Sequence, residues 1–466
     1  MSARFEAGRW TNWAGNVVAE PAEVVYPASV EETAEAVRRC RREGRKLRVV
    51  GSGHSFTPIA ASDGMMLSLD RMQGLIELDE EAGTALVWGG TKLRRLGRLL
   101  HERGWAQENL GDIDVQSIAG AIATGTHGTG RGFGNISTQA VELTVVTGAG
   151  DIVTCSESSH SDWFKALQVS AGMLGVIVQV RLRLQRAFRM EYSSSTLPLG
   201  DCLGRLDELA DGNRHFEFFW FPYAEPCQIK RMNPTERPSV ERPVRDYISD
   251  VLVENKLFGL LSEGCRLFPS LAPRISRLSA SSVPVGTKVS DSYRLFATER
   301  SVKFVEMEYN VPAEAMAPVI REMRAEMERQ RYRVHFPVEC RYAKGDDIPL
   351  SPAYGRDSAY IAVHMYKGMP HEAYFAAMER IFLAHGGRPH WGKLHSLGAA
   401  QLRGLYPRWD SFAAARRELD PDGVFLSGPM ARLFGETPPA GGADRSASGP
   451  DGGEAGDAGA GEARIG

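Results

Sequence analysis

Hydrophobic and polar positions divide the first part of the chain into short strands and helices. Ser29 can cap a helix over residues 33–43, the glutamates at 31 and 32 favour its positive end, and Gly44 ends it. Residues 92–103 place four leucines at core spacing, which predicts a second helix. Apolar runs predict strands at 47–50, 65–69, 75–79 and 84–88 and within 141–183. The chain up to about residue 185 therefore forms an α+β unit.

The pattern changes near residue 188. Alternating runs predict strands of an antiparallel sheet over 215–222, 302–310, 334–342 and 359–366. Residues 312–331 and 371–385 have the pattern of helices that cover such a sheet, and residues 402–426 are also helical. These elements predict a second α+β domain.

The predicted fold class is thus α+β with two domains, the second of which is built on an antiparallel sheet. We place the first domain at 1–186 and the second at 187–400, with an insertion near 234–284 that surrounds a modest apolar helix with Pro and Arg. A C-terminal helical segment follows at 401–434. Residues 435–466 are mostly Gly, Ala, Asp and Glu, a composition that predicts a disordered tail.

Charge and composition exclude several classes of protein. The net charge is −3, from 55 basic and 58 acidic residues, so we expect neither nucleic acid nor an anionic membrane surface as a partner. No apolar run approaches a membrane span, and the N-terminus has no signal-peptide core. The six cysteines are scattered without a C-x-x-C pair, which predicts no metal site and no disulfide framework and favours a cytoplasmic location.

A glycine loop with a histidine, Gly51-Ser52-Gly53-His54-Ser55, follows the strand predicted at 47–50. Glycines allow backbone N–H groups to approach an anion, but that task does not need a histidine. His54 therefore suggests a second role, such as a bond to a cofactor. Phe56 stands where a nicotinamide-binding G-x-G-x-x-G motif needs its third glycine, which disfavours that class. A loop that binds no ligand is the competing interpretation.

Two more segments of small residues lie in the same domain, at 119–130 and 171–177. The first interleaves glycines with threonines and allows close approach to a flat or phosphorylated ligand, although a tight-packing loop would look the same. Three such loops in one domain favour a cofactor of dinucleotide size.

Polar side chains in the second domain lie in pairs. Glu339 and Arg341 are two apart on a predicted strand and so share one face, as do His364 and Tyr366. The first pair is either a plain ion pair or part of a site that orients a hydroxyl. Residues 388–395 gather cations, potential cations and an indole, and we interpret this segment as functional.

Together these motifs resemble the vanillyl-alcohol-oxidase-type flavoproteins, in the branch of the aldonolactone oxidoreductases and alditol oxidases. The likeness runs from about residue 12 to about residue 434, and the motifs that carry it are 27–32, 51–55, 123–130, Glu339-x-Arg341 and His390-Trp391-Gly392-Lys393. The resemblance implies that the first domain binds FAD, that the second domain caps the flavin ring, and that His54 is covalently linked to the flavin 8α-methyl carbon. It further implies a set of cofactor-binding residues: Gly51, Ser52, Gly53, Ser55, Ser117, Gly120, Thr124, Gly125, Thr126, His127, Gly128, Gly175, Val176 and Ile177.

The resemblance also implies a reaction, the oxidation of a carbinol by hydride transfer to flavin N5. Arg341, Lys393 and Glu339 would be catalytic, with Lys393 assisting loss of the carbinol proton. Ser117, His364 and His390 would contact substrate hydroxyls. A sugar lactone of the L-gulono-1,4-lactone or D-arabinono-1,4-lactone type is the expected substrate. The alternatives are an alditol or another polyol, including one of specialised metabolism, and a non-catalytic protein that keeps the fold. Oxygen and another electron acceptor both remain open.

Overall fold

The helix predicted over 33–43 and the strand predicted at 47–50 are both present, and the strand belongs to a small parallel sheet. The computed structural model describes residues 4–6, 8–239, 244–297 and 302–436, with the backbone alone at 244–255, so nearly all of the predicted tail lies outside the described residues. Helix α1 (Val30–Arg42) begins at Ser29, whose hydroxyl accepts a hydrogen bond from the Glu32 N–H at 3.1 Å. The parallel sheet has the order β4-β6-β5, with strands Glu23–Val25, Met65–Leu67 and Leu47–Val49.

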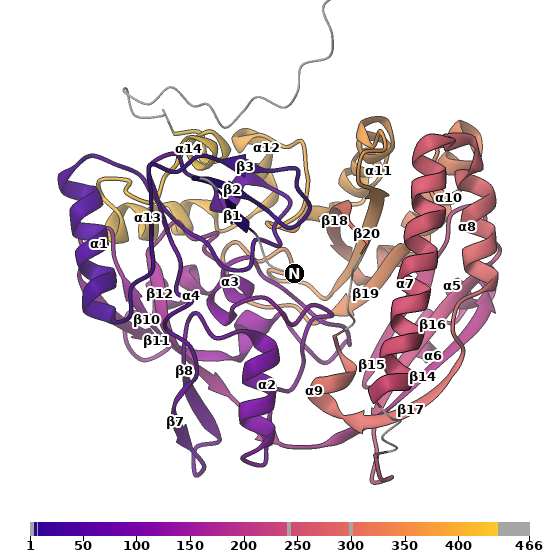
Figure 1. Cartoon of the computed structure of the whole chain (residues 1–466), viewed down its shortest axis with the longest axis horizontal. Helices are drawn as coiled ribbons and strands as arrows, with labels where there is room; N and C mark the ends of the chain where they lie inside the picture. Colours follow the sequence, from indigo (N-terminus) through magenta and orange to yellow (C-terminus); the bar gives the residue numbers. More distant parts are fainter. Residues whose placement is uncertain (1–3, 7, 240–243, 298–301, 437–466) are drawn as a thin grey trace, which may run out of the picture.

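A five-stranded antiparallel sheet completes the first domain (Figure 1). Its order is β11-β10-β12-β8-β7, with strands Ile152–Ser156, Ala140–Val146, Val176–Arg183, Thr84–Trp88 and Leu75–Asp79. Helices α2 (Leu93–His101), α3 (Ile118–Ala123) and α4 (Ser161–Gln168) belong to this domain. The short strands β1 (Arg4–Glu6), β2 (Arg9–Thr11) and β3 (Val18–Ala19) form a separate sheet, and β9 (Trp105–Ala106) pairs with β13 (Gln185–Arg186).

The second domain is an eight-stranded antiparallel sheet, as the alternating runs predict. Its order is β17-β14-β16-β15-β19-β20-β18-β21, with strands Gly286–Asp291, Arg189–Pro198, Pro226–Pro234, His215–Trp220, Val338–Ala343, Ser358–Tyr366, Phe304–Pro312 and Arg388–Pro389. Helices α10 (Met316–Gln330) and α11 (Glu372–Ala384) contact each other, and α11 packs on β18. Shorter helices are α5 (Leu199–Gly204), α6 (Leu206–Asp211) and α9 (Ser292–Leu295).

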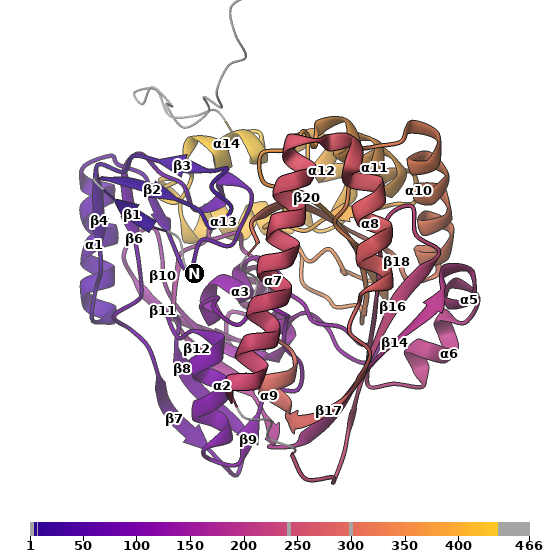
Figure 2. The same cartoon turned by 45° about the vertical axis from the view of Figure 1, so that its right-hand side comes forward.

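The segment predicted as an insertion forms a helical hairpin on the second domain. Helix α7 (Val244–Leu267) and helix α8 (Ala272–Ser281) lie side by side at the surface (Figures 1 and 2). The sequence predicts one modest helix here, whereas α7 alone has 24 residues. No helix in the described ranges combines the length and the apolar character that crossing a bilayer requires.

The C-terminal segment returns to the first domain instead of continuing the second. The Leu47 N–H donates to the Val424 carbonyl (2.9 Å), and the Gly148 N–H donates to the Leu419 carbonyl (2.8 Å). The predicted helix at 402–426 is wrong as a single element, because Pro407 and Pro421 interrupt it. It divides into α12 (Ala399–Leu405) and α13 (Trp409–Leu419), and α14 (Gly428–Phe434) follows.

Candidate active site

The glycine loop after β5 is held in place by the turn at residues 12–16. The Trp13 N–H donates to the Gly53 carbonyl (2.8 Å), and the Asn12 side-chain amide donates to the Ser55 carbonyl (2.9 Å). Gly53 has φ +66°, a conformation that glycine adopts without strain. The Trp13 indole stacks on the His54 imidazole, with ring centroids 5.3 Å apart and planes 22° apart. The loop therefore presents His54 in a fixed orientation.

The three small-residue loops surround one cavity of about 990 Å³, counted to its open mouth. The predicted cofactor residues that line it are Gly51, Ser52, Gly53, His54, Ser55, Ser117, Gly120, Thr124, Gly175 and Ile177. Thr126 and His127 line a neighbouring cavity instead, whereas Gly125, Gly128 and Val176 line neither.

The residues of this cavity fit FAD. A Cβ at Gly51 would lie 2.7 Å from the Ser117 hydroxyl, so the wall closes only with a glycine there. Buried Arg48 also lines the cavity. Its guanidinium donates hydrogen bonds to the neutral carbonyls of residues 59, 171, 172 and 425. Burial lowers the pKa of Arg48 to about 10, which still leaves a cation near neutral pH. A narrow, glycine-lined cavity with a cation in its wall suits a dinucleotide diphosphate.

A second cavity of about 550 Å³ adjoins the first and lies under the sheet of the second domain. His54, Ser55, Gln116 and Thr124 line both cavities, so the two lie side by side. The predicted catalytic residues Glu339, Arg341 and Lys393 and the predicted substrate residue His390 all line the second cavity. His54 thus stands at the junction between a cofactor-sized chamber and a polar chamber.

Three carboxylates surround Arg341. Strand β19 pairs Arg341 with Glu217 on β15, whose carboxylate accepts from the guanidinium Nε (2.8 Å), while Nη2 lies 3.1 Å from Asp112 and also contacts Glu339. Burial opposes the charge, yet Asp112, Glu339 and Glu217 hold the pKa of Arg341 well above its ordinary value. Burial likewise opposes ionisation of Glu217, but Arg341 and Lys230 lower its pKa. The Glu339–Arg341 pair is therefore part of a larger charged cluster.

Two acidic residues on β18 were missed by the sequence analysis. Glu306 and Glu308 share one face of the strand and line the polar cavity. The Lys393 ammonium lies 2.5 Å from the Glu306 carboxylate. The backbone N–H groups of Leu394 and His390 donate to the carbonyls of Glu306 and Glu308, at 2.9 and 3.0 Å, and fasten the 390–394 segment to β18. Glu306 and Glu308 are two residues apart on a predicted strand, the same spacing that identified Glu339 and Arg341, so the sequence could have indicated them.

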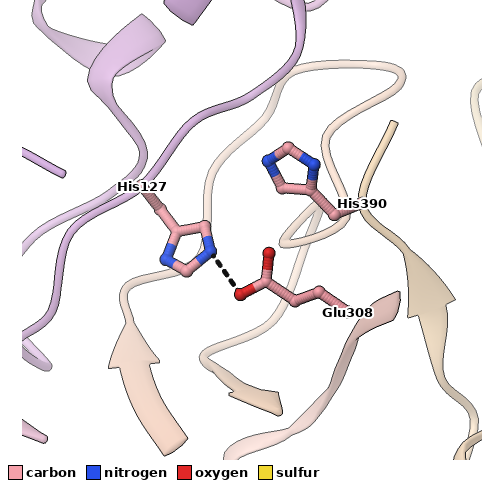
Figure 3. A group of neighbouring side chains, drawn as sticks. All are labelled: His127, Glu308 and His390. Atoms are coloured by element: carbon pink, nitrogen blue, oxygen red, sulfur yellow. Dashed lines mark hydrogen bonds and ion pairs between the residues drawn. The ribbon is translucent and has the colours of Figure 1, made fainter. Parts of the chain in front are cut away.

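Glu308 lies between two imidazoles (Figure 3). The His127 Nδ1 donates to the Gly128 carbonyl (2.9 Å), which leaves Nε2 to contact Glu308 at 3.0 Å. Burial disfavours the Glu308 carboxylate, but His127, Lys393 and His390 bring its pKa down to about 2. The His127 contact therefore favours the ionised form of the Glu308 carboxylate.

His390 completes this cluster as a neutral ring. Burial lowers its pKa to about 4, and its Nδ1 accepts the Gly392 N–H (3.0 Å), so Nε2 carries the hydrogen. The ligand atoms of His127, Glu308 and His390 lie within 4.8 Å of one another, close enough to hold a metal ion by distance alone. Because His390 presents an N–H and not a lone pair, we interpret the group as a hydrogen-bonded cluster.

Two predicted substrate residues do not face the polar cavity. His364 lies behind the carboxylates: its Nδ1 donates to the Pro337 carbonyl (2.9 Å), and its Nε2 lies 3.6 Å from Glu306 and 3.9 Å from Glu339. Ser117 lines only the larger cavity, where its hydroxyl accepts the Gly120 N–H and caps α3. Strand alternation correctly predicts that His364 lies on the same face of the sheet as the cavity. It cannot predict how far the side chain lies from the cavity, and Glu306 and Glu339 stand between the two.

Comparisons with known proteins agree with this arrangement. A family model described as an FAD binding domain matches residues 21–156, and one described as D-arabinono-1,4-lactone oxidase matches residues 180–433. L-gulono-1,4-lactone dehydrogenase of Mycobacterium tuberculosis is 43% identical over 426 residues, covering 91% of this chain and 99% of its own. L-gulonolactone oxidase of Bos taurus is 32% identical over 437 residues, covering 92% and 99%. The solved cholesterol oxidase of B. sterolicum has the same fold, with a TM-score of 0.76, 18% identity and coverage of 93% and 97%.

The FAD-binding domain, the antiparallel cap domain and the named relatives identify an FAD-dependent oxidoreductase. Within that class, the chain belongs to the aldonolactone oxidoreductase family, as the match over 180–433 and the 43% identity over nearly the whole chain show.

Proposed function

We propose that this protein oxidises a ring carbinol of a sugar 1,4-lactone, with FAD held covalently by His54. The single observation that carries the proposal is the position of His54, which lines both the glycine-rich cavity and the cavity that holds the charged residues. A lactone in the second cavity is then in direct reach of a cofactor in the first. The names of the relatives, which act on gulonolactone and arabinonolactone, support this substrate class.

The bound flavin would supply the hydride-accepting ring. Gly51 to Ser55, Ser117, Gly120, Thr124, Gly175 and Ile177 would hold the cofactor, because they form the wall of its cavity. Trp13 keeps the His54 imidazole in one orientation, as a covalent bond to a ring methyl carbon requires.

The polar cavity provides several hydrogen-bond acceptors for substrate hydroxyls. Glu306, Glu308 and Glu339 contact the Lys393 ammonium, the His127 ring and the Arg341 guanidinium, respectively. These contacts orient the three carboxylates, which still line the cavity. Their separate directions would fix a polyhydroxylated ring in one pose. Glu339 would in addition orient Arg341.

Proton removal is assigned differently from the sequence prediction. Lys393 was predicted to assist this step, but the ammonium of an ion pair has no lone pair to accept a proton. We propose that the Glu306 carboxylate accepts the carbinol O–H proton, while Lys393 donates a hydrogen bond to the same oxygen as it becomes a carbonyl. Oxidation at C2 of the lactone gives a 2-keto lactone, which enolises to an enediol.

A panel of compounds tests the proposal. Purified yellow protein is mixed without oxygen with L-gulono-1,4-lactone, D-arabinono-1,4-lactone and the matching alditols, and flavin bleaching is followed. Bleaching by the lactones is expected. Bleaching by the alditols alone would refute the lactone assignment in favour of a polyol oxidase. Peroxide formed when oxygen is admitted would identify oxygen as the acceptor, and bleaching without peroxide would point to another acceptor.

The covalent bond is tested separately. After denaturation in acid, the yellow colour is expected to remain with the protein, and His54→Ala is expected to release it. Release of FAD from the unaltered protein would disprove the covalent link and leave the substrate assignment untouched.

A further inference from the structure

The exposed apolar side chains of this protein are concentrated on the α7–α8 hairpin. Nine large hydrophobic residues are exposed in the described part of the chain, and six of them lie between residues 257 and 285. Leu260 is 72% exposed, Phe268 64% and Leu267 59%, and the others are Leu257, Leu278 and Val285. Scattered exposed apolar residues are ordinary, but a concentration of this kind marks an interaction surface.

The apolar residues of α7 form a row along one side of the helix. Leu257, Leu260 and Leu267 recur at intervals of three and seven residues, which places them on one face, and Phe268 continues the row at the helix end. The opposite face is occupied: the Phe258 ring packs 5.0 Å from Phe336, and Ser262 bonds with His335 (2.9 Å). The hairpin lies against the second domain (Figure 2). One face of α7 is fixed there, and the other carries the exposed apolar row.

Charge on the hairpin differs from that of the whole protein. The whole hairpin, residues 244–281, contains five basic and four acidic residues. From residue 256 onward it has four basic residues, Lys256, Arg266, Arg274 and Arg277, and one acidic residue, Glu263, which pairs with Arg266. The acidic residues of α7 other than Glu263 all lie in its first half, away from the tip at Leu267 and Phe268. Arginines beside an apolar ridge are the pattern of a helix that lies in the interface of an anionic bilayer.

We propose that the tip of the α7–α8 hairpin docks this protein on an anionic lipid surface. Leu260, Leu267 and Phe268 enter the headgroup region, and Arg274 and Arg277 contact lipid phosphates. A second copy of the chain fits less well, because face-to-face pairing would bring the basic residues of both hairpins together. The low net charge of the whole chain led us to expect no membrane surface as a partner. That overall value does not reveal the basic residues gathered near the tip of the hairpin.

Co-sedimentation with vesicles tests the proposal on the FAD-loaded full chain. Vesicles of phosphatidylcholine mixed with phosphatidylglycerol should bind the protein, vesicles of phosphatidylcholine alone should bind it less, and added salt should weaken binding. Leu260→Gln combined with Leu267→Gln and Phe268→Gln should lower the partition coefficient about tenfold or more. Arg274→Gln with Arg277→Gln should remove the preference for phosphatidylglycerol.

The matched control is Ile76→Gln with Ile152→Gln, two exposed apolar residues outside the hairpin, which should leave binding unchanged. Flavin absorbance and melting temperature verify that each variant is folded. Three results would overturn the proposal: no binding by the unaltered protein, equal binding by the triple variant, or a dimer in sedimentation velocity that the triple variant dissociates.

Discussion

Removal of Arg341 gives a sharp test of the charge arrangement around the polar cavity. In Arg341→Ala, Glu217, Glu339 and Asp112 lose their shared cation while they remain close together. Breaking a buried ion pair by removing one partner costs about 3–5 kcal/mol of unfolding free energy, mainly because the remaining charge is left uncompensated. We therefore expect a loss of this size at pH 7, and a fall in the rate of flavin reduction by lactone of about 10²–10³-fold.

The cause of that loss can be isolated with a second change. In the Arg341→Ala background, Glu217→Gln removes one of the carboxylates that have lost their cation. The unfolding free energy of the double variant should therefore exceed that of Arg341→Ala by about 1–3 kcal/mol. Denaturant unfolding of the FAD-loaded protein measures all the variants. If the double variant is no more stable than Arg341→Ala, or if Arg341→Ala reduces its flavin at the original rate, the reasoning about this cluster is refuted.

Further outcomes follow from the other charged groups. Glu306→Gln should slow flavin reduction by lactone about 10²–10⁴-fold and change its pH profile, if Glu306 accepts the carbinol proton; an unaltered profile would exclude that role. Glu308→Gln should raise the KM for lactone more than it lowers kcat, because it weakens a hydroxyl acceptor; the opposite split in steady-state kinetics would contradict this. Burial lowers the pKa of His335 to about 4 from an ordinary value of 6.5, so between these pH values the unfolded chain binds more protons and stability falls as the pH is lowered. His335→Gln should remove up to about 3 kcal/mol of that pH dependence, and an unchanged slope of unfolding free energy against pH would argue against a buried neutral His335.

The sequence predicted the two-domain α+β architecture because its local signals agree with the fold. Strand alternation identified the central strands of the second domain, and the Ser29 cap identified α1. The predicted strand at 334–342 begins late, at Val338, because Pro337 lacks a backbone donor. The domain boundaries at 186 and 400 remain predictions, although the return of the C-terminal segment to the first domain was not foreseen, since pairing between Leu47 and Val424 is a long-range contact.

The candidate site was predicted in part. The glycine-rich loops could be recognised as cofactor-binding because each is a short, continuous stretch of sequence. Most of their predicted cofactor residues line the larger cavity. The polar cavity depends on strand order instead: Glu217 reaches Arg341 only because β15 lies beside β19, and Asp112 comes from a loop of the other domain. His127 illustrates the limit, since its motif suggests cofactor binding while its side chain turns to Glu308 across the domain boundary.

The central claim is that a lactone held by the second domain gives up a C–H bond to the cofactor held by the first. Rapid mixing of the yellow protein, without oxygen, with L-gulono-1,4-lactone deuterated at C2 tests it most directly. We predict that the flavin bleaches, and that it bleaches several-fold more slowly than with the undeuterated lactone. No bleaching, or bleaching at the same rate with both lactones, would contradict the account.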